Sequence, residues 1–397
     1  MSKERQDVVK SNEAEEFFSS AKTIAKPLPI KSSLALFFST VLISLSAGFV
    51  AGLVQDTLLP IDSQILNFSQ SNQVDKKFDL SFLVDENQRA GQTEQLLSSY
   101  VVGVYNKKTQ ATALDSIYLP SEFLGTGMVV TSDGWILVPS SIINETKVVF
   151  VVNKKVYEPV TVVVDDFNES TLVKIDATGL TPASYVKEDA VNNFDLAFVV
   201  KFNQQNGIEV IKSTIKSNNF APRTDLKSYI KNTDTVDHWL TLNNQLPETF
   251  KGALVINQSG LIVGQVNAKT NAIIPHYYIV STVNQFLDKS EVVVRPNFGV
   301  NYLQLDEVIG LVDQVSGGQT KGALITSDGL KIDAVKKDSS ADKAGLLTGD
   351  IIIKVNDQEV MGVNSLTRLI QEYTPGTKIN LNLLRKGEKK DIEVILE

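Results

Sequence analysis

The side chains that carry acid–base and nucleophilic chemistry are scarce in this sequence. There is no cysteine, which excludes disulfides, thiolate metal sites and a cysteine nucleophile. The two histidines, His238 and His276, are too few for a histidine-rich metal site. His238 follows Asp237 in a polar segment, and His276 follows Pro275 at a strand start, so we expect a surface or strand-end imidazole in each case. The string Gly-x-Ser-Gly, which would mark an activated serine, does not occur in the sequence.

The stretch at 124–143 holds two apolar runs separated by turn residues. Met128, Val129 and Val130 form the first run, and 135–138 form the second. Ser-Asp-Gly at 132–134 lies between them, so the stretch predicts a β-hairpin. Gly125 precedes the first run and suits a place where another backbone or a ligand comes close.

This hairpin resembles the first barrel of the HtrA/Deg family of trypsin-like serine proteases, where it leads to Thr-Asn-x-His-Val and the His is the general base. Ser141 stands at the His position here. Counting back from Lys174-Ile175 puts Glu169 at the family's Asp, and counting back from 252–254 puts Lys251 at its nucleophilic Ser. Thr249-Phe250 replaces the Gly-Asn before that Ser. The resemblance therefore implies a degenerate protease without catalytic residues, whose oxyanion turn has lost its glycine.

One catalytic alternative remains at these positions. If the barrels fold as in the family, Ser141 and Lys251 face each other, and serine–lysine dyads with a desolvated lysine exist. Nothing visible in the sequence supplies an oxyanion hole for such a dyad. The favoured interpretation is a relic cleft in which Lys251 is solvated.

The elements that would position these residues are predicted to be mainly β. Short runs of β-branched and aromatic residues, separated by turn residues, recur through 95–288, the pattern of a barrel or sandwich. Tyr100 to Tyr105 and 277–280 are examples of such runs, and Ser99 to Tyr105 resembles the family's opening strand. A closing helix is predicted at 282–287, with Ser281 as its N-cap. Together with the resemblance, this predicts a trypsin-like double β-barrel.

The last part of the chain, 292–397, resembles the PDZ domain that follows the protease in HtrA proteins. Asn297-Phe298-Gly299-Val300 matches the carboxylate-binding loop, and 339–352 matches the motif Ser-Pro-Ala-x-x-Ala-Gly-Leu-x-x-Gly-Asp-x-Ile. An amphipathic helix is predicted at 364–373. The resemblance implies an α+β domain that adds an extended peptide to a sheet edge and holds its C-terminal carboxylate. The predicted peptide-binding residues are Asn297, Phe298, Gly299, Val300, Tyr302, Leu366, Leu369 and Ile370.

Charge and hydropathy indicate the class of partner and the cellular location. The net charge of −8 argues against nucleic acid as a partner, because phosphate binding needs clustered Lys and Arg. The segment 32–54 is apolar and uncharged, long enough to span a bilayer, and preceded by lysines. We therefore expect a cytoplasmic tail (1–31), a single transmembrane helix (32–54), a linker (55–94), the trypsin-like domain (95–288) and the PDZ domain (292–397), with both domains outside the cell membrane. A cleaved signal peptide is the competing interpretation of the apolar run.

Three functions fit these features. The leading one is a membrane-anchored HtrA-like pseudoprotease that binds peptide or protein C-termini, or unfolded segments, in bacterial envelope quality control or scaffolding. The second is an active serine endopeptidase of the HtrA family. The third is a regulatory partner of an active HtrA paralogue. The resemblance also implies a homotrimer, although no trimer determinant is visible in the sequence. No cofactor or metal is expected.

Overall fold

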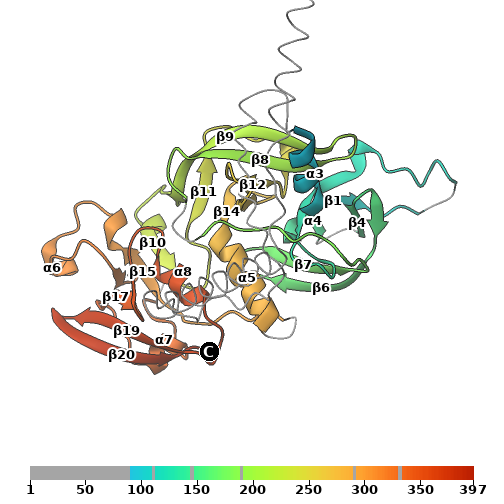
Figure 1. The fold of residues 1–397 in the computed structure, drawn as a ribbon. Coiled ribbons are helices and arrows are strands. Elements are labelled where there is room, and N and C mark those ends of the chain that lie inside the picture. Colours follow the sequence, from blue (N-terminus) through green and yellow to red (C-terminus); the bar gives the residue numbers. More distant parts are fainter. Residues whose placement is uncertain (1–89, 110–111, 144–146, 188–190, 289–291, 330–332) are drawn as a thin grey trace, which may run out of the picture. The chain divides into compact units, whose positions relative to one another are not determined.

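The computed structural model describes residues 90–109, 112–143, 147–187, 191–288, 292–329 and 333–397 (Figure 1). The predicted tail, the predicted transmembrane helix at 32–54 and most of the predicted linker lie outside these residues. Among the helices in the described part of the chain, none is both long enough and apolar enough to cross a membrane.

The first domain begins with helix α3 (Ala90–Tyr100) and continues as a seven-stranded sheet. The strand order is β5-β4-β1-β2-β3-β7-β6, and every neighbouring pair is antiparallel. The strands are β1 (Val101–Asn106), β2 (Phe123–Val129), β3 (Trp135–Pro139), β4 (Val148–Val152), β5 (Lys155–Tyr157), β6 (Pro159–Asp165) and β7 (Ser170–Ile175), with the short helices η2 (Pro120–Glu122) and α4 (Ser140–Ile143) beside them.

Six further strands close into a barrel in the order β11-β14-β13-β12-β8-β9. They are β8 (Leu196–Asn203), β9 (Gly207–Phe220), β11 (Trp239–Leu242), β12 (Leu254–Ile256), β13 (Ile262–Val266) and β14 (Ile273–Pro275), with η3 (Lys227–Tyr229) and η4 (Glu248–Phe250) in the connections. The prediction of a mainly β domain is therefore confirmed.

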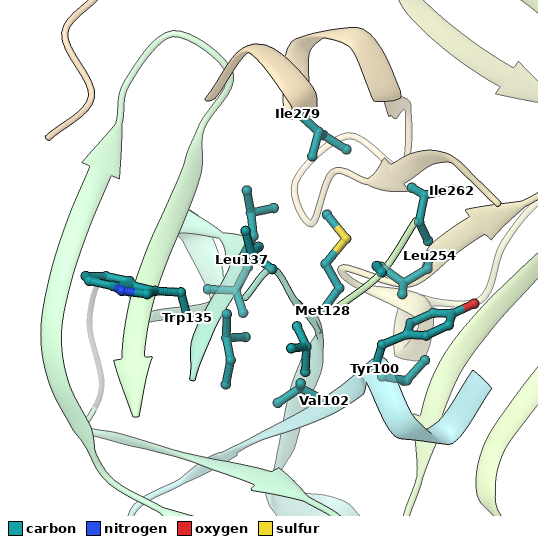
Figure 2. Close-up of a cluster of buried hydrophobic side chains, with 14 of the residues drawn as sticks. Tyr100, Val102, Met128, Trp135, Leu137, Leu254, Ile262 and Ile279 are labelled. Carbon is teal, nitrogen blue, oxygen red and sulfur yellow. The ribbon is translucent and has the colours of Figure 1, made fainter. Parts of the chain in front are cut away.

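A shared apolar core holds the first sheet against the barrel. All five residues of β3 are buried, which explains why its sequence is a continuous apolar run and not an alternating one. Met128 from the sheet and Leu254 and Ile262 from the barrel belong to one buried cluster (Figure 2). The Trp135 ring packs edge-on against Phe286, with 4.5 Å between ring centroids. This core fixes the end of β3, where the predicted catalytic position Ser141 follows.

The closing helix is longer than predicted. α5 spans His276–Asp288, so the run at 277–280 that was read as a strand is helical. Ser281 lies inside the helix and is not its N-cap; its hydroxyl donates to the carbonyl of Gln371 at 2.6 Å. Tyr278, Val283 and Phe286 of α5 belong to the buried core, and most of the helix is buried. This burial outweighs the local β-propensity of the aromatic and β-branched residues.

The C-terminal domain is α+β, as predicted. Its sheet runs in the order β10-β15-β16-β17-β19-β20, and β18 pairs with β17. Its elements are β15 (Asn301–Gln304), η5 (Leu305–Glu307), α6 (Asp313–Ser316), β16 (Ala323–Ile325), α7 (Ser340–Lys343), β17 (Ile351–Val355), β18 (Gln358–Glu359), α8 (Leu366–Gln371), β19 (Lys378–Arg385) and β20 (Glu388–Ile395). The first strand of this sheet, β10 (Ile230–Asn232), comes from the connection between β9 and β11 of the barrel.

Candidate functional site

The predicted hairpin is present and leads to Ser141, the first of the three positions that the resemblance assigns to catalytic residues. Strand β2 pairs with β3, with Met128 opposite Leu137, and Gly134 turns the chain with φ +107°. Ser141 follows in helix α4, where it is half-buried. The neighbouring Ser140 is the one bound into the structure, since its hydroxyl lies 2.7 Å from the hydroxyl of Thr171.

The other two positions have partners of their own. The Glu169 carboxylate contacts Lys269 Nζ at 3.2 Å and Asn267 Nδ2 at 3.4 Å. Lys251 Nζ lies 3.5 Å from the Glu248 carboxylate, and its side chain is 41% exposed, so it is solvated as predicted. Within the described ranges, no hydrogen bond or ion pair joins any two of the Ser141, Glu169 and Lys251 side chains.

An aliphatic side chain fills the space between the two backbones at this place. A Cβ added to Gly125 would lie 2.5 Å from Ile142 Cδ1, and one added to Gly252 would lie 3.1 Å from the same atom. The Cβ added to Gly252 would also lie 2.1 Å from the carbonyl oxygen of Thr126. The Thr126 N–H donates to the carbonyl of Lys251 at 2.9 Å. The two glycines therefore let the backbone at 125–126 pack closely against the backbone at 251–252. The Ile142 side chain lies beside this contact.

The predicted carboxylate-binding loop has the conformation that its glycine requires. Gly299 has φ +75°, and a Cβ there would lie 2.4 Å from Ser339 Cβ. Asn297 and Phe298 bond through their carbonyls to the N–H groups of Ser340 and Ala341, which fixes the loop on helix α7. The other predicted groove residues, Val300, Tyr302, Leu366, Leu369 and Ile370, are all at most 1% exposed and belong to the core of this domain.

A segment of the chain itself lies along the predicted peptide-binding edge. Strand β10 pairs antiparallel with β15, with Lys231 opposite Tyr302. Beyond the strand, the Thr233 N–H donates to the carbonyl of Val300 at 3.0 Å. The Gly299 N–H donates to the Asp234 carboxylate at 3.2 Å. A side-chain carboxylate is therefore bound by the loop that was predicted to bind a C-terminal one.

Helix α8 contacts the same segment from its other side. The Thr367 hydroxyl donates to the carbonyl of Asn232 at 3.1 Å, and Gln371 Nε2 donates to the carbonyl of Thr233 at 2.9 Å. The segment Ile230–Asp234, which we call the groove segment, thus lies between β15 and α8.

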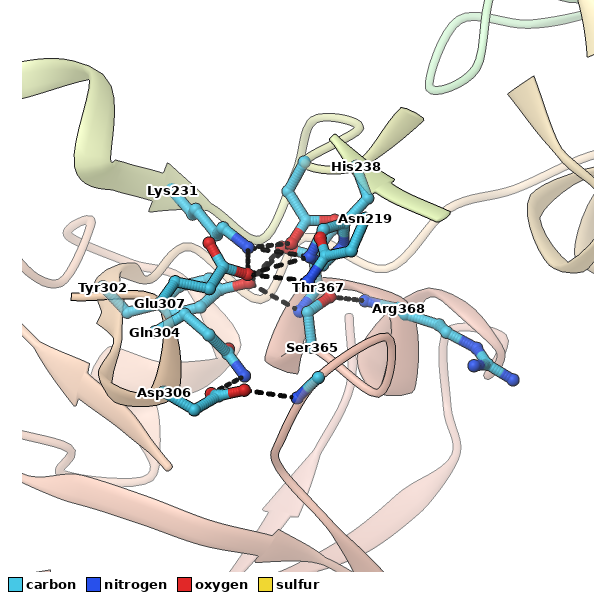
Figure 3. A network of polar contacts seen from close by, with 12 residues as sticks. Asn219, Lys231, His238, Tyr302, Gln304, Asp306, Glu307, Ser365, Thr367 and Arg368 are labelled. Carbon is cyan, nitrogen blue, oxygen red and sulfur yellow. Dashed lines mark hydrogen bonds and ion pairs between the residues drawn. The ribbon is translucent and has the colours of Figure 1, made fainter. Parts of the chain in front are cut away.

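A buried ionic cluster surrounds the one cation of the groove segment (Figure 3). Lys231 Nζ lies 2.5 Å from Glu307 Oε1, 2.8 Å from His238 Nε2 and 3.4 Å from Asp237 Oδ2. Its side chain is 3% exposed. Arg223 also pairs with Glu307. Three side chains from the β9–β11 connection, those of Arg223, Lys231 and His238, therefore contact one carboxylate of the C-terminal domain. Asp237, from the same connection, contacts Lys231 and His238.

The charges in this cluster shift one another's ionisation. Burial opposes ionisation of Glu307, but the hydrogen bond from His238 and the charge of Lys231 outweigh it and lower the pKa of Glu307 to about 2. Burial likewise opposes ionisation of Asp237, yet His238 and Lys231 hold the pKa of Asp237 well below its usual range. For His238, burial favours the neutral ring, but Asp237 and Glu307 raise its pKa above the ordinary value. Both carboxylates are ionised at neutral pH.

The surface expectation for the histidines is wrong. His238 is fully buried in this cluster, because Asp237 and Glu307 replace the water that it loses. His276 is 4% exposed and begins helix α5 directly after strand β14. Burial, aided by the charge of Arg368, lowers the pKa of His276 to about 4, so it is neutral at pH 7. Neither imidazole contacts a predicted catalytic position.

Sequence reasoning missed the groove segment and its ionic cluster. The sequence analysis assigned no element to the three residues of β10, because their pairing partner lies about seventy positions away along the chain. The one usable signal was the Asp237-His238 dipeptide, because the chain has only two histidines. No group of three or more His, Cys, Asp or Glu in the described ranges could hold a metal ion.

Comparison with known proteins agrees with this architecture. Residues 305–396 match the family model of the PDZ domain. The serine endoprotease DegS of Haemophilus influenzae is 24% identical over 316 residues, which cover 76% of this chain and 86% of that protein. Over three quarters of its length the chain is thus similar to a serine endoprotease, and its C-terminal part matches a PDZ domain.

Other HtrA proteins agree over shorter shares of their length or at lower identity. A probable periplasmic serine endoprotease, DegP-like, of Chlamydia trachomatis is 24% identical over 280 residues, which cover 68% of this chain and 53% of that relative. The solved HtrA-type protease AlgW with tripeptide has a TM-score of 0.52 at 17% identity, and the match covers 75% of this chain and 93% of AlgW. At that identity the match shows the fold alone: a trypsin-like β domain followed by a PDZ domain.

Proposed function

We propose that this HtrA-like chain is a pseudoprotease that binds the C-termini of proteins, or extended segments of unfolded ones, through its PDZ domain. Its trypsin-like domain acts as a scaffold. The observation that carries the proposal is the set of side chains at the positions that the resemblance assigns to the catalytic residues. These are Ser141, Glu169 and Lys251, and Glu169 and Lys251 are paired with other side chains.

The packing at this place supports the same conclusion. A serine protease needs backbone N–H groups aimed at the developing oxyanion, and a glycine-rich turn normally presents them. Here Thr249 and Phe250 precede Lys251 in the short helix η4, and Phe250 is 1% exposed. Ile142 lies in the adjoining space, where a Cβ built on Gly252 would be 3.1 Å from its Cδ1.

The test is hydrolysis of a fluorescently labelled unfolded protein by the purified full chain in mild detergent. We expect no cleavage above that in buffer, and no change on Lys251→Ala or Ser141→Ala. Cleavage that disappears in either variant, but persists in the matched surface variants Lys216→Ala and Ser259→Ala, would mean that the cleft has been rewired and would overturn the proposal.

Serine endopeptidase activity is the second candidate, because DegS and the DegP-like relatives are named serine endoproteases. It predicts cleavage in the same assay that is inhibited by a serine-directed covalent inhibitor. A third candidate, regulation of an active HtrA paralogue, predicts mixed oligomers when the two chains are purified together.

The proposed setting is the bacterial cell envelope. The DegP-like relatives are named periplasmic, and the apolar run at 32–54 would anchor the N-terminus with its tail in the cytoplasm. Reaction of a single cysteine introduced at Asp176, which is exposed, with a membrane-impermeant thiol reagent in intact cells tests this orientation, because the chain has no cysteine of its own.

A further inference from the structure

We propose that the groove segment Ile230–Asp234 is a built-in ligand of the PDZ groove. A peptide that has a free C-terminal carboxylate, and a basic residue two positions before its last residue, binds by displacing it. This inference rests on the proposed peptide-binding function. It adds to that function the state of the free protein and the chemical class of the peptide.

The backbone contacts are those of an added strand. A peptide recognised by strand addition pairs its main chain with the sheet edge, and main-chain hydrogen bonds supply the affinity. Strand β10 pairs with β15 at Ile230, Lys231 and Asn232, and the Thr233 N–H continues the pairing to Val300. Thr367 and Gln371 of α8 bind the carbonyls of Asn232 and Thr233 from the opposite side. An external peptide cannot occupy the same edge at the same time.

Asp234 takes the place of a terminal carboxylate. Its Oδ1 accepts from the Gly299 N–H, and the adjacent Val300 N–H donates to the Thr233 hydroxyl at 3.0 Å. Thr233 is therefore the residue that corresponds to the last residue of a bound peptide. In that register, Lys231 corresponds to the residue two positions before the last.

The surroundings of Lys231 determine which peptide replaces the segment well. Glu307 belongs to the PDZ domain and stays in the groove after the segment leaves, whereas Lys231 leaves with it. Lys231 is one of three basic side chains that contact Glu307, with Arg223 and His238. Its departure removes one of these partners from a largely buried carboxylate, and a peptide Lys or Arg at the same position restores it. A peptide Glu at that position would place a second negative charge beside Glu307, which disfavours binding.

The segment is suited to release. Strand β10 has three residues, and only Lys231 among them is fully buried. Because the segment is tethered, its local concentration is on the order of millimolar, which a peptide must overcome. The apparent affinity for a peptide falls in proportion to the fraction of open molecules. Fixing the segment should therefore abolish binding, and weakening it should improve binding.

The test is a disulfide that fixes the groove segment to β15 and that a reductant can open. We call this pair of cysteines the lock. Asn232 and Asn301 are directly opposite, and Asn232 Nδ2 donates to Asn301 Oδ1 at 2.8 Å, so their side chains share one face. The full chain with Asn232→Cys and Asn301→Cys can close a disulfide there, with no native thiol to interfere. The matched control is Asn382→Cys with Asp391→Cys, an opposite pair in β19 and β20 with the same kind of side-chain contact.

The probe is a fluorescent peptide that ends in Ile-Lys-Asn-Thr with a free carboxylate, and binding is followed by anisotropy. We expect the oxidised lock to bind at least about tenfold more weakly than its reduced form. The control pair should bind equally in both forms. The same peptide with Glu in place of Lys, or with a C-terminal amide, should bind about tenfold more weakly to the reduced protein.

The outcomes distinguish failure of the built-in ligand from failure of the proposed peptide-binding function. Equal binding by the oxidised and reduced lock, or failure of the two cysteines to join in the folded protein, overturns the built-in ligand and leaves peptide binding intact. Equal binding of the Lys and Glu peptides overturns the proposed peptide class. If the folded protein binds no peptide in any form, the proposed function itself fails and the inference fails with it.

A second variant tests the same point by weakening the segment. Asp234→Arg places a positive charge against the Gly299 N–H, and we expect peptide affinity to rise at least about threefold. Asp176→Arg is the matched surface variant, and its affinity should equal that of the unmodified chain. A drop in affinity for Asp234→Arg, in protein that remains folded by circular dichroism, would contradict the built-in ligand.

Discussion

Two glycines of the PDZ domain share a backbone conformation but differ in what surrounds them. Gly299, in the carboxylate-binding loop, has φ +75°, and Gly310 has φ +83°. A Cβ at Gly299 would lie 2.4 Å from Ser339 Cβ, whereas a Cβ at Gly310 would meet nothing within 4 Å. At one position the glycine is required for both conformation and space, and at the other for conformation alone.

This comparison predicts unequal costs for the same substitution. Gly310→Ala should lower the free energy of unfolding by about 1 kcal/mol, the usual strain of a left-handed alanine. Gly299→Ala should lower it by about 1–3 kcal/mol more, because the loop must also move away from Ser339. Urea denaturation of both variants measures the difference. Equal destabilisation would mean that the loop adapts freely, and that its shape does not depend on the glycine.

At the scale of elements, helix α8 differs most from what its sequence suggests. The pattern at 364–373 predicts one apolar and one polar face, yet every residue from Leu366 to Gln371 is buried. The polar face, with Thr367 and Gln371, is covered by the groove segment. An amphipathic pattern identifies the helix but not what covers its polar face, because that partner comes from a distant part of the chain.

Hydrogen exchange tests whether the groove segment covers the polar face of α8. The Thr233 amide should exchange slowly, since it donates to Val300, although it lies in a connection between two barrel strands. Saturation with the lysine peptide should accelerate exchange at Thr233 and leave the amides of β19 and β20 unchanged. Exchange at Thr233 as fast as in an exposed loop, before any peptide is added, would contradict the strand pairing.

At the scale of the whole molecule, the sequence predicted what depends on local pattern. The hairpin before Ser141, the mainly β domain and the α+β domain were predicted from runs, turns and motifs. The helical state of 277–280 was not, because it depends on burial of a face against residues from other strands. The buried state of His238 and the place of Asp234 depend on contacts between the barrel and the PDZ domain, which no short stretch of sequence records.

The contact between these domains should weaken in acid. The lowered pKa of Glu307 means that its contribution to stability is present above pH 4.5 and is lost as the pH falls toward 2. Asp237 acts in the same direction, and Arg223, Lys231 and His238 are the cations that face these carboxylates. The raised pKa of His238 acts oppositely, since its contribution is lost as the pH rises through that pKa.

We therefore expect Glu307→Gln to lower the free energy of unfolding at pH 6 by on the order of 2 kcal/mol, and by progressively less below pH 4.5. Urea denaturation followed by the fluorescence of Trp239, which lies next to His238, measures this. Glu209→Gln, which removes an exposed carboxylate paired with Lys201, serves as the control and should change little at any pH. A pH-independent loss for Glu307→Gln would mean that the carboxyl acts by shape and not by charge.

Strand β10 also gives the molecule a mechanical linkage. It lies in the connection between β9 and β11, two adjacent strands of the closed barrel, and it is at the same time the first strand of the PDZ sheet. A pull on the PDZ domain is therefore carried as tension into both barrel strands at once. On the proposed mechanism, release of the groove segment would slacken that connection, so a peptide bound in the PDZ groove would lower the tension on β9 and β11.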